Sequence, residues 1–155
     1  MAPRKPKSVA PPPARWGGLA EGATVLVDTA PFIYLLEDHP VFLPRFLGLF
    51  EASERGEVRL ALSVITLAEI LTGPHKAGLP DLAKRYETVL ASRHSVVPVT
   101  APIAGLAAQL RARYRLKLPD ALQLATALDI GAAALVTHDR DFAEVQGIPV
   151  LTGGE

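Results

Sequence analysis

Two kinds of apolar pattern alternate along this chain: short apolar runs bounded by turn residues, and longer runs with apolar positions at helical spacing. The short runs predict buried strands at 24–28, 59–63, 95–99, 134–137 and 148–151. The longer runs predict helices over about 32–36, 41–54, 64–71, 79–93, from 101 onward and 118–131, with Gly73-Pro74 ending the third. Strands separated by helices predict an α/β fold, in which a parallel sheet is covered on both faces.

The first predicted strand ends in Asp28 and Thr29, just before Pro31 at the start of a helix. In open α/β sheets, ligands bind at the carboxyl ends of the strands. A carboxylate buried there is costly to desolvate, so it needs a cation or hydrogen-bond donors as partners. Asp28 or Thr29 could instead cap the following helix, and taken alone these two residues leave both interpretations open.

Two predicted helices carry a polar residue at every third position among Ala, Leu, Ile and Val. Residues three apart share a helix face, so each helix presents one narrow polar seam on an otherwise apolar surface. One seam is Ser63, Thr66, Glu69 and Thr72, and the other is Asp120, Gln123, Thr126 and Asp129. A solvent-facing seam usually carries Lys and Glu, which makes that interpretation weak for Glu69. Asp120 could also complement the helix dipole.

The fourth predicted strand ends in Thr137, and Asp139 and Asp141 follow directly. Turn or cap roles would explain each acid singly, but they do not easily explain Asp28, Glu69, Asp120 and Asp139 together. Carboxylates gathered in one place repel each other unless a cation joins them. Oxygen ligands without cysteine favour Mg²⁺, with Mn²⁺ as a second possibility, and such ions act on phosphodiesters.

In this interpretation Asp28, Asp120 and Asp139 hold the first metal ion, directly or through water. Glu69 orients or deprotonates the attacking water, or helps to bind a second ion. Thr29, Thr66 and Thr137 are expected to orient the carboxylates by hydrogen bonding. Cations at Arg111, Arg113, Arg115 and Lys117 precede Asp120 and could flank a phosphate path, although a solvated helix end explains them equally well.

Composition limits the remaining possibilities. The chain has 155 residues, the length of one domain, and equal numbers (16 each) of basic and acidic side chains, so its net charge does not indicate a nucleic-acid partner. The absence of cysteine excludes disulfides and thiolate metal sites and fits a cytoplasmic protein. Residues 1–23 are rich in Pro, Ala, Lys and Arg and are expected to be a disordered arm, which leaves 24–152 as the domain. No run is apolar and long enough to span a membrane.

Four segments together resemble the four acidic motifs of the PIN domain, most closely in toxins of the VapC type: Val-Leu-Val-Asp28-Thr29, Ser63-Val-Ile-Thr66-Leu-Ala-Glu69, Leu118-Pro119-Asp120 and Thr137-His-Asp139-Arg-Asp141. The resemblance implies a three-layer α/β/α sandwich with a five-stranded parallel sheet. It also implies a Mg²⁺-dependent endoribonuclease, often a homodimer, silenced by an antitoxin whose C-terminal segment lies across the active site. Asp28, Glu69, Asp120 and Asp139 match the acidic positions, Thr137 the hydroxyl of the fourth motif, and Asp141 a frequent additional acid.

Several alternatives fit less well. A haloacid-dehalogenase-like phosphatase needs a second Asp two residues after Asp28, where this chain has Ala30. The pair His138-Asp139 suggests an HD-type phosphohydrolase. That site needs several histidine ligands on helices, whereas His138 follows a predicted strand. Two alternatives remain open: a PIN-like module that binds RNA or protein without cleavage, and a housekeeping RNA-processing nuclease.

Overall fold

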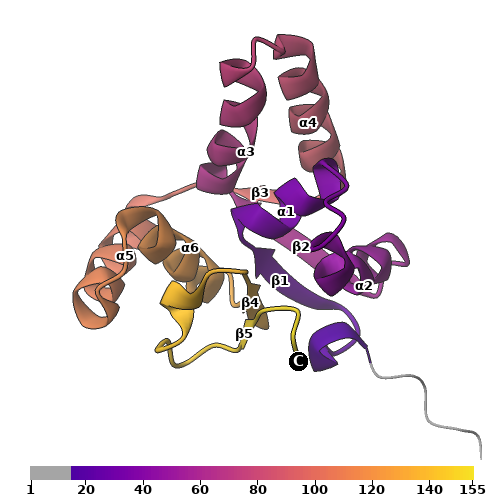
Figure 1. Ribbon diagram of the computed structural model, residues 1–155. Helices are drawn as coiled ribbons and strands as arrows, with labels where there is room; N and C mark the ends of the chain where they lie inside the picture. The colour runs from indigo at the N-terminus through magenta and orange to yellow at the C-terminus, as the bar shows by residue number, and fades with distance from the viewer. Residues whose placement is uncertain (1–14) are drawn as a thin grey trace, which may run out of the picture.

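The structure is a computed structural model, and it describes residues 15–155. Five strands form one parallel sheet in the order β3-β2-β1-β4-β5, with β1 at its centre (Figure 1). The strands are β1 (Ala23–Val27), β2 (Val58–Ser63), β3 (Ser95–Val97), β4 (Ala134–Val136) and β5 (Val150–Leu151). The α-helices are α1 (Thr29–Leu36), α2 (Leu43–Glu54), α3 (Val64–Lys76), α4 (Pro80–Arg93), α5 (Ala101–Tyr114) and α6 (Leu118–Asp129), and the 3₁₀ turns are η1 (Trp16–Gly18) and η2 (Arg140–Phe142). The predicted α/β class, five-stranded parallel sheet and three-layer arrangement are confirmed.

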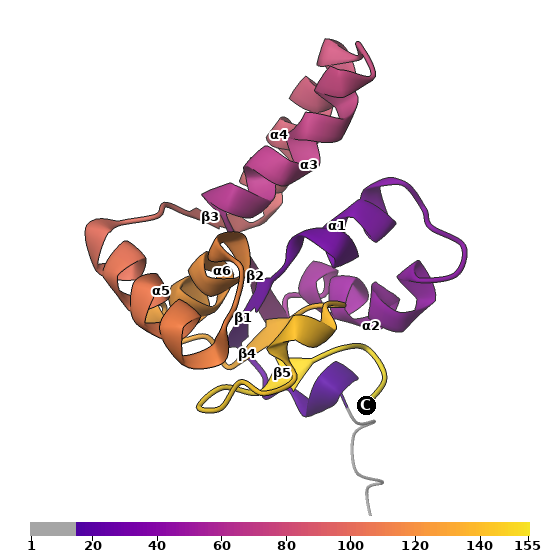
Figure 2. The ribbon, with the colours of Figure 1, turned by 60° about the vertical axis from the view of Figure 1, so that its left-hand side comes forward.

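Helices cover both faces of the sheet, with α1 and α2 on one side and α5 and α6 on the other (Figure 2). Strand β1 shows why its sequence is apolar without alternation. Val25 and Val27 belong to the core that contains Phe32 and Phe46, whereas Leu26 belongs to the core that contains Leu124. Because both faces of β1 are buried, every position of the strand after its first two residues must be apolar.

Helices α3 and α4 form a hairpin that points away from the sheet (Figure 2). The prediction that Gly73-Pro74 ends α3 is wrong, because the helix continues to Lys76 with Pro74 buried in its last turn. Gly78 ends the helix instead: it has a φ of 71°, and the next residue, Leu79, donates its N–H to the Pro74 carbonyl at 2.9 Å. A glycine in the left-handed region satisfies the last carbonyls of a helix, and here it dominates over the upstream proline.

The two edge strands are shorter than predicted. Strand β3 ends at Val97, before Pro98, and β5 begins at Val150, after Pro149. Proline has no N–H to donate to a neighbouring strand. Pro98 therefore limits β3 at its C-terminal end, and Pro149 limits β5 at its N-terminal end.

The predicted disordered arm, residues 1–23, lies largely outside the described residues, which begin at 15. Its last part is folded, since Leu19 is buried and Trp16 packs against Phe46 with ring centroids 6.2 Å apart. The Trp16 indole also donates to the Arg45 carbonyl at 2.9 Å. Large apolar side chains give this short segment enough burial to order it, and all the prolines of the predicted arm precede it in the sequence. Across residues 15–155, every helix is too short or too polar to cross a membrane.

Candidate active site

Acidic side chains from four separate segments meet at the carboxyl edge of the sheet. Asp28 follows β1, Asp139 follows β4, Glu69 lies in α3 and Asp120 in the first turn of α6. All four line one open pocket of about 600 Å³. The structure therefore brings together the four carboxylates that the sequence analysis singled out.

Asp28 is both a helix cap and a pocket residue. Its Oδ1 accepts from the Thr29 N–H at 2.8 Å at the start of α1, and its Oδ2 accepts from the Thr137 hydroxyl at 2.8 Å. Burial raises the pKa of Asp28, the two hydrogen bonds act to lower it, and the charge of Asp139 raises it further. Thr137 also accepts from the Asp139 N–H at 3.0 Å, so its hydroxyl joins two of the acidic segments.

Asp120, Asp139 and Asp141 form the tightest part of the cluster. One carboxylate oxygen from each lies within 4.8 Å of the others. Asp139 is held in place because its Oδ1 accepts from the Asp141 N–H at 2.9 Å at the start of η2. Burial, and after it the charges of Asp139, Asp28 and Asp141, together raise the pKa of Asp120 to about 6, while the charge of Lys117 opposes them.

Glu69 lies at the outer side of the pocket. Burial raises its pKa, the charge of Asp28 acts in the same direction, and hydrogen bonding with Thr29 opposes both. The pKa values of Asp28, Glu69 and Asp120 are thus all raised, which is the expected response of carboxylates that share one poorly solvated place. A hard divalent cation bound by carboxylate oxygens would remove this repulsion, and the donor set fits such an ion.

The two polar seams form a buried network behind the acids. The Thr29 hydroxyl donates to the Thr66 hydroxyl oxygen at 3.3 Å, and the Gln123 amide donates to the same oxygen. Thr66 and Gln123 are 0% and 1% exposed, so neither seam is a solvent face at its centre. Thr126 is buried too, but it bonds to its own helix at the Leu122 carbonyl. The network links α1, α3 and α6, and Gln123 is a member whose role the sequence analysis did not identify.

The pocket has a second wall that the sequence analysis did not assign, made in part by Tyr34, His138 and Arg140. Tyr34 lies in α1 and the other two follow β4. His138 had been considered only as a part of a possible HD motif. Its ring nitrogens contact Tyr34 and Arg45, so the imidazole has partners other than the acids.

The four cations predicted to flank an RNA path do not line this pocket, although the charge of Lys117 acts on Asp120. Within the described chain the pocket lining includes none of Arg111, Arg113, Arg115 and Lys117. Arg111 donates to the Leu116 carbonyl at 3.3 Å, and the Arg113 guanidinium lies 5.1 Å from the centre of the Tyr114 ring. Arg140 does line the pocket, and its position within the fourth motif was the signal that could have identified it.

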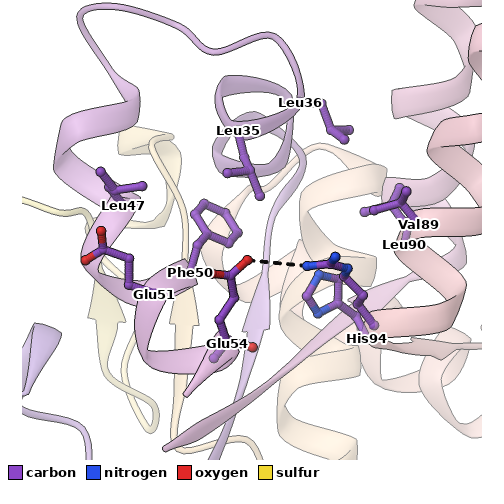
Figure 3. A pocket seen from close by; sticks show the side chains of 11 residues that line it. Leu35, Leu36, Leu47, Phe50, Glu51, Glu54, Val89, Leu90 and His94 are labelled. Atoms are coloured by element: carbon purple, nitrogen blue, oxygen red, sulfur yellow. Dashed lines mark hydrogen bonds and ion pairs between the residues drawn. The ribbon is translucent and has the colours of Figure 1, made fainter. Parts of the chain in front are cut away.

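A separate apolar groove of about 480 Å³ lies between α1, α2 and α4 (Figure 3). Its walls include Leu35, Phe50 and Leu90, and Leu47 and Val89 are 39% and 42% exposed along it. An ion pair of 3.3 Å between Arg93 and Glu54 crosses the groove.

Comparison with known proteins agrees with this geometry. The family model of the PIN domain matches residues 25–148. A structure of a toxin–antitoxin complex from Klebsiella pneumoniae is 31% identical, covers 84% of this chain and 98% of its own, and superposes with a TM-score of 0.67. The search of curated proteins found no match.

Two further solved structures share the fold at lower identity. VapBC2 from Rickettsia felis, solved with a DNA fragment from its promoter, is 20% identical over 82% of this chain and 96% of its own, with a TM-score of 0.67. VapC20 of Mycobacterium tuberculosis, described as a toxin that cleaves the sarcin–ricin loop, is 19% identical over 81% of this chain and 99% of its own, with a TM-score of 0.64.

Proposed function

Because the match over residues 25–148 shows that this chain belongs to the PIN domain family, we propose that it is a Mg²⁺-dependent endoribonuclease and the toxin of a toxin–antitoxin pair. The observation that carries this proposal is the meeting of Asp28, Glu69, Asp120 and Asp139 in one pocket. A binding module would gain nothing from carboxylates that repel each other and raise the pKa of Asp120 to about 6. A metal-dependent nuclease needs that arrangement.

In the proposed reaction, Asp28, Asp120 and Asp139 would hold the metal ion, and Asp141 is close enough to Asp120 and Asp139 to share in the site. Mg²⁺ bound there would polarise the phosphodiester and lower the pKa of a bound water. Glu69, across the same pocket, would orient or deprotonate the attacking water. Thr137 would keep Asp28 aimed at the pocket through its 2.8 Å hydrogen bond.

The test is cleavage of a labelled RNA pool of random sequence by the purified chain in Mg²⁺, in Mn²⁺ and in EDTA. We expect cleavage only with a divalent ion. Asp28→Asn and Glu69→Gln should each lower the rate by about 100-fold or more while the fold is kept. Asp129→Asn is the matched control, since Asp129 lies at the exposed far end of α6. RNA binding without cleavage would instead favour the binding-module alternative.

We infer that the antitoxin partner uses the groove between α1, α2 and α4 (Figure 3). The groove has exposed apolar walls and the acidic side chain of Glu51, which suit an apolar segment with a basic flank. The similar structure from Klebsiella pneumoniae is itself a toxin–antitoxin complex. Co-purification with the product of a neighbouring small gene tests the toxin role, and the absence of such a gene would favour a housekeeping nuclease. Light scattering on the purified chain tests the expected homodimer.

A further inference from the structure

Three side chains that are distant in sequence form a continuous hydrogen-bonded chain beside the acidic pocket. The Arg45 guanidinium Nη1 lies 3.1 Å from His138 Nε2, and His138 Nδ1 lies 2.6 Å from the Tyr34 hydroxyl. Arg45 comes from α2, Tyr34 from α1, and His138 follows β4. Tyr34 and His138 both line the pocket that the four acids line.

The chemistry of these groups fixes the direction of each hydrogen bond. Arginine has only donors, so His138 Nε2 must accept and therefore carries no proton. The proton of the neutral imidazole is then on Nδ1, which donates to the oxygen of Tyr34. As a result, the hydroxyl proton of Tyr34 is not used by His138 and can be donated to another acceptor.

The surroundings hold this arrangement in place. His138 lies edge-on to Phe42 and Phe46, with ring centroids 4.9 and 5.8 Å away. The Arg45 carbonyl accepts from the Trp16 indole at 2.9 Å. A Cβ added to Gly153 would lie 2.8 Å from that same carbonyl, so the C-terminal segment also packs on Arg45. Segments from both ends of the described chain thus hold the backbone of Arg45 in place.

The donor inventory of the pocket shows what the free Tyr34 proton could do. The carboxylates offer only acceptors when ionised, and the Thr29 hydroxyl already donates to Thr66. Thr29 also lies within hydrogen-bonding reach of Glu69, so its single hydroxyl proton has protein acceptors on both sides. Among the side chains that line the pocket in residues 15–155, this leaves the Tyr34 hydroxyl and the Arg140 guanidinium as donors that can face a ligand. A phosphodiester presents acceptor oxygens, so it requires donors of this kind as well as a cation.

We propose that Tyr34 is a substrate-binding residue that donates its hydroxyl proton to a phosphate oxygen of the RNA, and that Arg45 is a positioning residue that acts through His138. The proposal rests on the nuclease function proposed above. It assigns a role to the pocket wall that carries no acid, and it explains why an aromatic cluster and an arginine lie against His138. Burial raises the pKa of Tyr34, so the hydroxyl keeps its proton as a donor at neutral pH.

The first test measures RNA binding without cleavage. Fluorescence anisotropy of a 20-nucleotide random RNA pool, in Ca²⁺ in place of Mg²⁺, gives the dissociation constant, and Mg²⁺ kinetics give KM and kcat. Tyr34→Phe should raise the dissociation constant and KM by about tenfold or more, the usual cost of a hydrogen bond to a charged acceptor, and should change kcat by less than about threefold. Tyr86→Phe, which removes a hydroxyl from the half-buried Tyr86 of α4 outside the pocket, should change neither value.

The second test asks whether Arg45 acts through Tyr34. Arg45→Met should weaken RNA binding by about three- to tenfold in the parent chain, and by less than about twofold when Tyr34→Phe is already present. Arg140→Met should weaken binding equally in both backgrounds, because Arg140 does not depend on Tyr34. In long-range proton–nitrogen NMR spectra of the RNA-free protein, His138 should be the Nδ1–H tautomer, and Arg45→Met should give a mixture of tautomers.

Three results would overturn the proposal. A Tyr34→Phe variant that binds and cleaves RNA like the parent would remove Tyr34 from the substrate site while leaving the nuclease function intact. Equal effects of Arg45→Met in both backgrounds would show that Arg45 acts by its own charge. If the parent chain neither binds nor cleaves RNA, both the proposed function and the role of Tyr34 are refuted, whatever tautomer the NMR spectra show.

Discussion

Replacing Asp120 by Asn should stabilise the metal-free protein at neutral pH, because the substitution removes the cost of burying an ionised carboxylate and its repulsion by Asp139, Asp28 and Asp141. The pKa of Asp120 rises from 3.8 to about 6 on folding. At about 1.4 kcal/mol per pKa unit, this corresponds to about 3 kcal/mol of lost stability when the group is ionised. Solvent screens the partly exposed carboxylate, so we keep about half of that value. Loss of a favourable charge in the first turn of α6 costs about 0.5 kcal/mol, which leaves a net gain of about 1 kcal/mol.

The sign of the pH dependence follows from the raised pKa. Protonated Asp120 contributes stability that is fully present below about pH 4 and is lost as the pH rises through about 6. In EDTA, the Asn variant should therefore equal the parent or be slightly less stable at pH 4.5. At pH 7.5 its free energy of unfolding should be about 1 kcal/mol higher, or about 2–4 °C in Tm.

Urea unfolding at the two pH values measures the effect, and Mg²⁺ then reverses it. At a concentration 100 times its dissociation constant, Mg²⁺ should stabilise the parent by about 2.7 kcal/mol, and the Asn variant by much less. Asp129→Asn, at the other end of the same helix, should change stability by a similar small amount at both pH values and keep the Mg²⁺ response. If Asp120→Asn were destabilising in EDTA at pH 7.5, neither burial nor the neighbouring acids would penalise the ionised Asp120, and the metal-site interpretation would be wrong.

Three further substitutions test separate parts of the structure. Thr137→Val removes both hydrogen bonds of its hydroxyl and should lower the free energy of unfolding by about 1–3 kcal/mol and reduce cleavage; unchanged stability in urea would contradict this. Leu47→Glu on the apolar groove should abolish antitoxin binding in a titration while RNA cleavage is kept, and full binding would exclude the groove. Gly153→Ala, at a φ of 74° and against the Arg45 carbonyl, should lower Tm by several degrees, and an unchanged Tm would refute the close approach.

Periodicity predicted most of this fold because each strand and helix carries its own local pattern. The apolar run before Asp28 is uninterrupted since both faces of β1 are buried, and the two polar seams repeat every three residues because they lie on helices. The same patterns placed Glu69 and Asp120 on seams and Asp28 and Asp139 at strand ends, which is enough to bring the acids to one edge. Gly78, rather than Gly73-Pro74, set the end of α3 because the backbone conformation decides a helix end.

The wall made by Tyr34, His138 and Arg45 could not be predicted in this way. His138 is 104 residues from Tyr34 and 93 from Arg45, and no local period links them. Their meeting depends on how α1 and α2 pack beside the segment after β4, which is tertiary information. The cations just before Asp120 were predicted to flank an RNA path because they are close to that acid in the sequence. Proximity in sequence was not enough to place them in the pocket lining.

Asp28 shows why capping a helix and binding a metal ion do not exclude each other for this residue. A carboxylate has about four lone-pair sites, and here one oxygen accepts from the backbone of α1 while the other accepts from Thr137. Each oxygen therefore keeps a further site that can face a cation. The cap fixes the rotamer of Asp28 before any ligand arrives, so the same hydrogen bond that starts the helix also preorganises the proposed metal ligand. An acid at a strand end that also caps the following helix is thus already oriented to bind a cation.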